Sequence, residues 1–253
     1  MGLSSCQLSS WNRQMWTDEN AENIIENCKR YNIKNSTFWC GWCGPAVWNF
    51  YEGPETLGLV PLTYRFERMK DLMLGSDFAK KIGVADVATH VGFIPENPND
   101  ALYPGLVSSL KVIAGHCKSN GQYFNFETGQ ETPVTLLRII EDIGLDNLGI
   151  NLDPANFILY GKANPCDAMD IIGKYVRGIH GKDGLYPTSG RELGHEVKIG
   201  DGKVNFPKLI KLLNEYNYKG DITIEREISG DQQIKDILES SAYLKELLSQ
   251  YQW

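Results

Sequence analysis

Hydrophobic and polar positions follow two alternating patterns: short runs rich in β-branched and aromatic residues, and longer stretches with apolar residues three and four positions apart. The short runs predict β-strands at Leu3–Leu8, Ile33–Cys40, Val84–Val91, Tyr123–Glu127, Leu148–Asp153, Val176–Gly181 and Ile222–Glu225, with a weaker one at Glu196–Ile199. The longer stretches predict helices at Glu19–Tyr31, Tyr64–Ile82, Leu106–Ser119, Val134–Ile143, Asp167–Tyr175, Phe206–Tyr216 and Gln232–Leu248. This alternation is typical of a parallel sheet wrapped by helices.

The number and spacing of these elements favour a closed barrel. Thr132 followed by Pro133 is a typical helix start, and Gly144 follows the last apolar position of that helix. Eight strands in 253 residues leave about 32 residues for each strand and helix, just above the roughly 30 that such a unit needs. A doubly wound sheet would usually show a glycine-rich first turn, and no G-x-G-x-x-G follows Leu3–Leu8. We therefore predict an α/β fold with a single (β/α)8 TIM barrel domain over residues 1–253.

Composition and charge narrow the classes of function. Hydrophobic residues make up 42% and charged residues 23% of the chain, as in globular proteins. The net charge is −7, from 25 Lys and Arg against 32 Asp and Glu, so binding along a nucleic-acid backbone is not expected. No run is apolar enough to span a bilayer, and the first twenty residues lack a signal-peptide pattern. We expect a cytoplasmic protein that binds neither nucleic acid nor membrane.

Four ionisable residues end predicted strands in a regular way. Glu127 ends YFNFE, Asp153 ends GINLD, His180 ends VRGIH and Glu225 ends DITIE, at separations of 26, 27 and 45 residues. Because the carboxyl ends of barrel strands share one mouth, these side chains should converge there. An oxygen-rich set with one imidazole suits one divalent metal ion, with Mn²⁺ in first place and Mg²⁺ or Co²⁺ as alternatives.

The same reasoning places two further features at the barrel mouth. His90 ends the run DVATH, and the aromatic stretch Phe38–Glu52 follows the second predicted strand. Its WCGWCGP order contains a C-x-x-C, but a redox motif of this type should open a helix, which glycine and proline disfavour here. The stretch, including Trp39, is better interpreted as an aromatic wall beside the site, since flat side chains cover the apolar faces of sugar rings or aromatic aglycones.

Five segments in the second half of the chain carry a family resemblance. They are FETGQETP at Phe126–Pro133, GINLDPANF at Gly149–Phe157, IHGKDG at Ile179–Gly184, IGDGKVNF at Ile199–Phe206 and ITIERE at Ile222–Glu227. In order and spacing they resemble the xylose isomerase-like TIM-barrel superfamily of sugar isomerases and epimerases, which is related to ketose 3-epimerases and family 2 apurinic endonucleases. The resemblance implies metal ligands at Glu127, Asp153, His180 and Glu225.

Two departures limit what the resemblance implies. Ketohexose 3-epimerases usually carry a substrate-contacting histidine three residues after the aspartate ligand, where this chain has Asn156. The endonucleases use further Asp and His ligands for a metal cluster, and Gly194 and Glu196 stand at positions where that group carries Asp and His. Together with the net charge, these differences disfavour DNA repair.

The expected chemistry is proton abstraction next to a carbonyl. A divalent cation that chelates a carbonyl oxygen and the adjacent hydroxyl lowers the energy of the enediolate formed when a carbon-bound proton leaves. Glu127 and Glu225 come from different parts of the barrel, so one can abstract the proton and the other return it, which makes them the catalytic candidates. His90, Asn156, Lys182 and Trp39 are the candidates for substrate binding.

Several alternatives stay open. The main prediction is a metal-dependent sugar isomerase or epimerase; the alternative is a metal-dependent lyase that cleaves 3-oxo-glycosides by β-elimination from the same enediolate. A sugar-binding barrel without catalysis is a more remote alternative. The expected partner is a small-molecule sugar or sugar derivative, and the acidic chain favours an unphosphorylated one. Barrel rims commonly form interfaces, so a homo-oligomer is open to this chain as well as a monomer.

Overall fold

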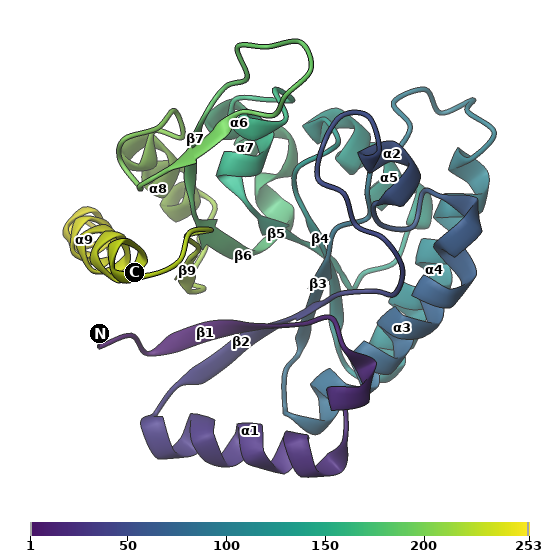
Figure 1. Cartoon of the computed structure of the whole chain (residues 1–253), viewed down its shortest axis with the longest axis horizontal. Coiled ribbons are helices and arrows are strands. Elements are labelled where there is room, and N and C mark those ends of the chain that lie inside the picture. Colours follow the sequence, from purple (N-terminus) through teal and green to yellow (C-terminus); the bar gives the residue numbers. More distant parts are fainter. Residues whose placement is uncertain (1, 252) are drawn as a thin grey trace.

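A computed structural model describes residues 2–251 and 253. Seven parallel strands form a nearly closed barrel in the order β1-β2-β3-β4-β5-β6-β9 (Figure 1). Their bounds are β1 Ser5–Ser10, β2 Lys34–Cys40, β3 Asp86–Thr89, β4 Tyr123–Glu127, β5 Leu148–Leu152, β6 Val176–Gly181 and β9 Ile222–Ile224. The TIM barrel predicted from the sequence is confirmed.

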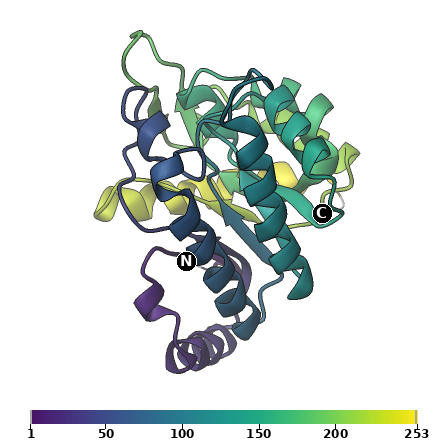
Figure 2. The same cartoon turned by 90° about the vertical axis from the view of Figure 1, so that its right-hand side faces the viewer.

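Helices cover the outside of this barrel (Figures 1 and 2). The long ones are α1 Asp18–Tyr31, α3 Leu62–Lys81, α4 Tyr103–Ser119, α5 Pro133–Ile143, α7 Pro165–Ile172, α8 Phe206–Glu215 and α9 Asp231–Leu248, with the short α2 Gly53–Thr56 and α6 Pro154–Leu159 and the 3₁₀ turns Arg13–Met15 and Gly173–Tyr175. The residue range of each predicted helix overlaps that of one of the long helices, and the bounds differ by at most three residues. Neither α2 nor α6 was predicted, because one or two turns are too short to show a helical period.

Local signals set the bounds of α5. The hydroxyl of Thr132 accepts the backbone N–H of Thr135, Pro133 occupies the first helical position, and Gly144 ends the helix with φ +67°. Apolar residues on one face of α5 are fully buried against the sheet, while its other face is exposed. The helix therefore begins and ends where the sequence predicts, because its caps and its amphipathic face agree.

The weak strand expected at Glu196–Ile199 does not join the barrel. Residues His195–Val197 form β8, which pairs antiparallel with β7 (Asp183–Leu185) in a separate two-stranded sheet. The buried carboxylate of Asp183 explains this path, because it accepts backbone N–H groups from Gly200, Gly202 and Val204 and holds the segment over the end of β6. The prediction for this segment was right about extended backbone and wrong about its partner.

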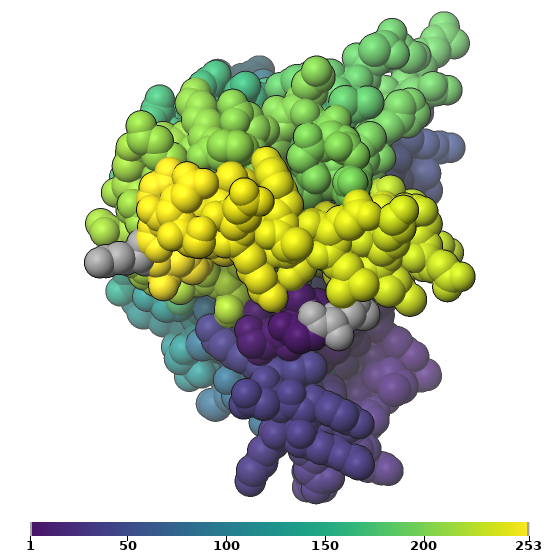
Figure 3. Space-filling model, turned by 90° about the vertical axis from the view of Figure 1, so that its left-hand side faces the viewer, coloured from purple at the N-terminus to yellow at the C-terminus, as the bar shows by residue number. Residues whose placement is uncertain are grey.

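The two ends of the sheet meet beside the C-terminal helix. Strands β1 and β9 are in contact, and α9 packs against β9 and α8. Figure 3 shows α9 in yellow lying directly next to the purple N-terminal strand. A continuous apolar core fills the space between sheet and helices, and large side chains such as Phe38, Phe124 and Phe126 are fully buried in it. Of the helices in the described part of the chain, none combines the length and apolar character needed to cross a membrane.

Candidate metal and sugar site

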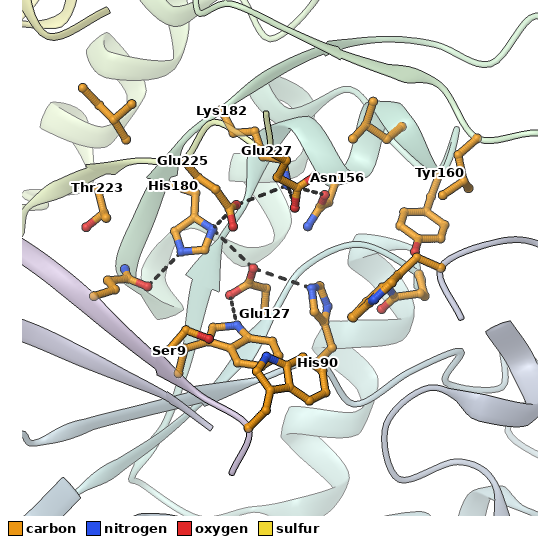
Figure 4. A pocket seen from close by; sticks show the side chains of 18 residues that line it. Ser9, His90, Glu127, Asn156, Tyr160, His180, Lys182, Thr223, Glu225 and Glu227 are labelled. Atoms are coloured by element: carbon orange, nitrogen blue, oxygen red, sulfur yellow. Dashed lines mark hydrogen bonds and ion pairs between the residues drawn. The ribbon is translucent and has the colours of Figure 1, made fainter. Parts of the chain in front are cut away.

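The carboxyl ends of the strands surround a pocket of about 580 Å³. Glu127 is the last residue of β4, Asp153 follows β5, His180 lies near the end of β6 and Glu225 follows β9. One potential ligand atom from each of these four residues lies within 4.8 Å of those of the other three. The structure thus brings together all four residues selected from the strand ends, and Figure 4 shows Glu127, His180 and Glu225 pointing toward one another.

An amide network fixes the orientation of His180. Asn151 Nδ2 donates to Glu127 Oε2 at 2.7 Å, and a carboxylate only accepts, so the amide of Asn151 has one possible orientation. Its oxygen then accepts Gln7 Nε2 at 2.9 Å, which turns Gln7 Oε1 toward His180 Nε2 at 2.8 Å. Because that oxygen is an acceptor, Nε2 carries a proton. In the neutral imidazole the lone pair is therefore on Nδ1.

His180 Nδ1 faces three carboxylates. It lies 3.1 Å from Glu225 Oε2, 3.3 Å from Glu127 Oε1 and 3.6 Å from Asp153 Oδ2. Burial opposes a charge on this ring, but Glu127 and Glu225 outweigh burial and raise the pKa of His180 well above its ordinary value. The cluster attracts positive charge at Nδ1, which either a proton or a metal ion can supply.

Glu127 is held by two donors on one oxygen. Trp39 Nε1 donates to Oε2 at 2.8 Å, alongside the bond from Asn151, so Oε1 remains directed at the cluster. His90 Nε2 lies 3.6 Å from that Oε1. Burial would raise the pKa of Glu127, but the nearby His180 and His90 lower it below its usual range. The carboxylate is therefore the favoured form of this buried side chain.

Asp153 presents one buried carboxylate oxygen to the cluster. Its Oδ1 caps α6 by accepting the N–H of Asn156 at 2.9 Å. Its Oδ2 is fully buried and accepts no hydrogen bond, and His180 Nδ1 is likewise buried without one. Buried polar atoms are normally hydrogen-bonded, so these two atoms, which lack a hydrogen bond and face each other at 3.6 Å, fit a cation between them. Three carboxylates and one imidazole are a suitable donor set for a divalent ion.

Lys182 lies beside the cluster and is buried among acidic groups. Its Nζ lies 3.4 Å from Asp153 Oδ2, 3.2 Å from Glu225 Oε2 and 3.0 Å from Glu227 Oε1. Asn156 Oδ1 is 3.5 Å away. Burial alone would lower the pKa of Lys182, but these carboxylates raise it well above its ordinary value. Lys182 therefore stays positively charged in the pocket.

The other sequence candidates also line this pocket. His90, Asn156, Lys182 and Trp39 all contribute to its wall. Sequence reasoning missed Gln7 and Asn151, whose amides support the ligands, as well as Glu227 on the pocket wall. A signal for Asn151 was present, since it precedes Asp153 by two residues in the same strand and shares its face.

The C-x-x-C pair has no redox geometry. Cys40 is buried at the end of β2, Cys43 is exposed in the following loop, and both are free thiols. Burial raises the pKa of both thiols, with Asp71 adding to the effect. A reactive redox cysteine requires a lowered pKa, so the interpretation as an aromatic wall is favoured over the redox one.

The fold and the pocket define an α/β barrel with an acidic, imidazole-containing centre at its mouth. A family model described as xylose isomerase-like TIM barrel matches residues 1–247, and the chain belongs to that family. Over 98% of this chain and 90% of the other, the structure is similar to that of a xylose isomerase domain protein from Planctomyces limnophilus, with 35% identity and a TM-score of 0.94.

Two more distant similarities agree with this assignment. A D-tagatose 3-epimerase-like protein shares 22% identity and a TM-score of 0.77 over 98% of this chain and 90% of its own. At 22% identity this similarity shows a shared fold and nothing about the reaction. An uncharacterized protein of Methanocaldococcus jannaschii is 30% identical over 173 residues, which are 64% of this chain and 56% of that protein. This chain therefore covers little more than half the length of that relative.

Proposed function

We propose that this protein is a divalent-metal-dependent sugar isomerase or epimerase that removes a proton next to a carbonyl and returns it. The convergence of Glu127, Asp153, His180 and Glu225, with two buried atoms of the cluster lacking a hydrogen bond, carries the proposal. Membership of the xylose isomerase-like family supports it.

The two glutamates divide the proton chemistry. Glu127 is fixed through Oε2 by Trp39 and Asn151, which directs Oε1 at the acidic centre, where it can take a carbon-bound proton. Glu225 is about one-third exposed toward the pocket, so a substrate can reach its carboxylate from the open side. Strands β4 and β9 are separated by β5 and β6 in the sheet, so the two carboxylates approach a bound carbon from different directions.

Lys182 and Asn156 supply the binding groups beside the glutamates. The ammonium of Lys182 can donate to a sugar oxygen and balance the negative charge that develops there. A bound divalent ion, Mn²⁺ in our proposal, supplies Lewis-acid polarisation of the carbonyl and adjacent hydroxyl. His90, at the far side of Glu127, borders the space in which the reacting carbon would lie.

Metal content is the first test. Protein prepared with added manganese and washed is analysed by elemental mass spectrometry, with Asp153→Asn and Glu225→Gln as site variants and Asp201→Asn, in an exposed loop, as the matched control. We expect about one metal per chain in the wild type and the control, and a clear loss in both site variants. Equal metal content in all four proteins, or none in any of them, would contradict the proposed site.

The reaction itself is tested by solvent exchange. Ketoses and aldoses are incubated with the metal-loaded protein in heavy water, and deuterium at the carbon next to the carbonyl is followed by NMR. Epimerisation and isomerisation are distinguished by the sugar formed. Release of an aglycone from a 3-oxo-glycoside would instead identify the β-eliminating lyase, which the aromatic pocket wall also favours. Absence of deuterium uptake with a fully metal-loaded protein would contradict both reactions.

A further inference from the structure

Four tryptophans form a continuous aromatic surface that leads from Glu127 to the outside of the pocket. The ring centroids of Trp11 lie 5.1 Å from Trp39 and 5.0 Å from Trp42, and Trp42 lies 6.5 Å from Trp48. The inner pair, Trp39 and Trp42, is buried, whereas Trp11 is 43% and Trp48 40% exposed. Trp11, Trp39 and Trp48 line the same pocket as the acidic centre. We call the two outer rings, Trp11 and Trp48, the aromatic platform.

Trp11 is held in place although it is exposed. Its indole lies directly on the backbone of Gly41, where an added Cβ would come within 2.4 Å of the ring. Only glycine leaves room for this approach. Together with the contacts to Trp39 and Trp42, it prevents the ring from turning away from the pocket.

Trp48 stands on a loop that a buried arginine fixes. The guanidinium of Arg68, on α3, is fully buried and donates to backbone carbonyls of the loop, namely those of Cys43, Pro45, Thr56 and Gly58. Trp48 also packs edge-on against His90, with the ring centroids 5.0 Å apart. Its position beside the site is thus built into the fold. Exposing the apolar surface of this indole to water is unfavourable in free energy, and a ligand that covers the ring would remove that cost.

Two buried polar side chains of the remaining pocket wall lack a well-formed hydrogen bond. The amide of Gln130 and the hydroxyl of Tyr160 are buried next to each other, and neither makes a hydrogen bond of good geometry. Both line the pocket that contains the platform. A surface with aromatic faces on one part and unsatisfied hydrogen-bonding groups on another matches a carbohydrate, which has apolar ring faces and hydroxyls around its edge.

Charge restricts what this pocket accepts. Within the described chain, Lys182 is the one Lys or Arg that lines the pocket, and three carboxylates already surround it. Three glutamates, Glu127, Glu225 and Glu227, line the same space. A phosphate group would meet net negative charge here, so an uncharged ligand is favoured.

We propose that the aromatic platform binds the apolar face of a second ring, so that the substrate is an uncharged glycoside whose first ring carries the carbonyl, rather than a free monosaccharide. This inference rests on the proposed function, because it takes from it that the first sugar ring reacts at the acidic centre. The pocket volume of about 580 Å³ falls within the roughly 300–1,000 Å³ that is typical of small-molecule pockets. The second ring, aromatic or pyranose, lies against Trp11 and Trp48 while the first reaches Glu127.

Binding of three glucosides tests the platform without turnover. Methyl β-D-glucopyranoside, phenyl β-D-glucopyranoside and cellobiose are titrated into the manganese-loaded full chain, and contacts are mapped by saturation-transfer NMR. We expect the compounds with a second ring to bind about three- to tenfold tighter than the methyl glucoside, with strong saturation of the second ring. The relative affinities of phenyl glucoside and cellobiose show which ring type is preferred. Glucose 6-phosphate should bind more weakly than the methyl glucoside.

Variants assign the preference to the platform. Trp48→Ala and Trp11→Ala should each reduce the ratio of phenyl to methyl affinity, and Trp48→Tyr should retain most of it because a flat ring remains. Phe66→Ala removes a more exposed aromatic ring, 66% exposed, on the outer face of α3 and serves as the control. Equal binding of all three glucosides, an unchanged ratio in the double Trp11→Ala and Trp48→Ala variant, or an equal loss in Phe66→Ala would overturn the proposal.

The outcomes separate the platform from the chemistry. Asp153→Asn and Glu225→Gln alter the acidic centre and should leave the ratio of phenyl to methyl affinity unchanged. A ring preference that depends on Trp48 in a protein without bound metal or deuterium uptake would support the platform and contradict the proposed reaction. Metal binding and deuterium uptake without a preference for compounds with a second ring would support the proposed reaction and contradict the platform.

Discussion

A buried carboxyl group near the site gives the sharpest stability prediction. Glu131 lies in the turn between β4 and α5, is 2% exposed, and has one carboxyl oxygen without a hydrogen-bond partner. Burial raises the pKa of Glu131 from 4.5 to about 8. In the folded protein at neutral pH this side chain is therefore protonated, whereas in the unfolded chain it is ionised.

The sign and size of the effect follow from this difference. Between pH 4.5 and about 8 the folded state holds a proton at Glu131 that the unfolded state has released, so the free energy of unfolding falls as pH rises. One pKa unit corresponds to about 1.4 kcal/mol, so raising the pH from 5 to 7 should remove about 2.5 kcal/mol of stability through this group. Glu131→Gln keeps the shape without the charge and should abolish this contribution.

Denaturant unfolding measures the effect directly. Wild type, Glu131→Gln and the exposed control Glu141→Gln, on the adjoining helix α5, are unfolded in urea at pH 5, 6, 7 and 8 with a chelator present, so that metal binding does not contribute. The stability of Glu131→Gln relative to wild type should rise steadily with pH, and that of the control should not. Parallel pH profiles for wild type and Glu131→Gln would refute the reasoning.

Three further substitutions test how glycine and arginine support the site. Gly178→Ala would bring a Cβ within 2.3 Å of Asn151 Oδ1 and disturb the amide that supports the ligands, so metal affinity measured by chelator competition should fall about 10- to 100-fold. Arg68→Met leaves buried loop carbonyls without donors and should lower the free energy of unfolding in urea by about 3–5 kcal/mol; a loss below 1 kcal/mol would contradict this role. Gly58→Ala adds a Cβ within 2.0 Å of a backbone carbonyl, at φ +66°, and should lower the melting temperature far more than Gly83→Ala, which has a similar φ but open space around it.

The convergence of the four candidate ligands could be predicted from the sequence, because it depends on local patterns and one general rule. Glu127, Asp153, His180 and Glu225 each follow an apolar run, and parallel strands of a barrel place their carboxyl ends at one mouth. No knowledge of side-chain conformation is needed for that step. The segment at Glu196–Ile199 shows where the rule fails, because extended backbone alone does not determine which strand it pairs with.

The support for the ligands could not be predicted, because its contacts are distant in sequence. Gln7 and Asn151 are 144 residues apart, and the strand pattern that puts Asn151 two residues before Asp153 does not indicate Gln7 as its partner. Their supporting role is found only in the folded barrel, where Gln7 on β1 and Asn151 on β5 are hydrogen-bonded to each other across the interior. The fixed tautomer of His180 depends on this pairing.

Trp39 joins the acidic centre to the aromatic surface. Its N–H fixes Glu127 Oε2, and its ring supports Trp11 at 5.1 Å. In the proposed mechanism, the same side chain sets the direction of a proton-transferring carboxylate and supports the proposed ring-binding surface. A glycoside whose second ring is held against Trp11 and Trp48 would have its first ring directed toward Glu127, because both contacts share one rigid support. On these proposals, ring recognition and proton abstraction would be geometrically linked in this barrel, although the residues assigned to them can be varied separately.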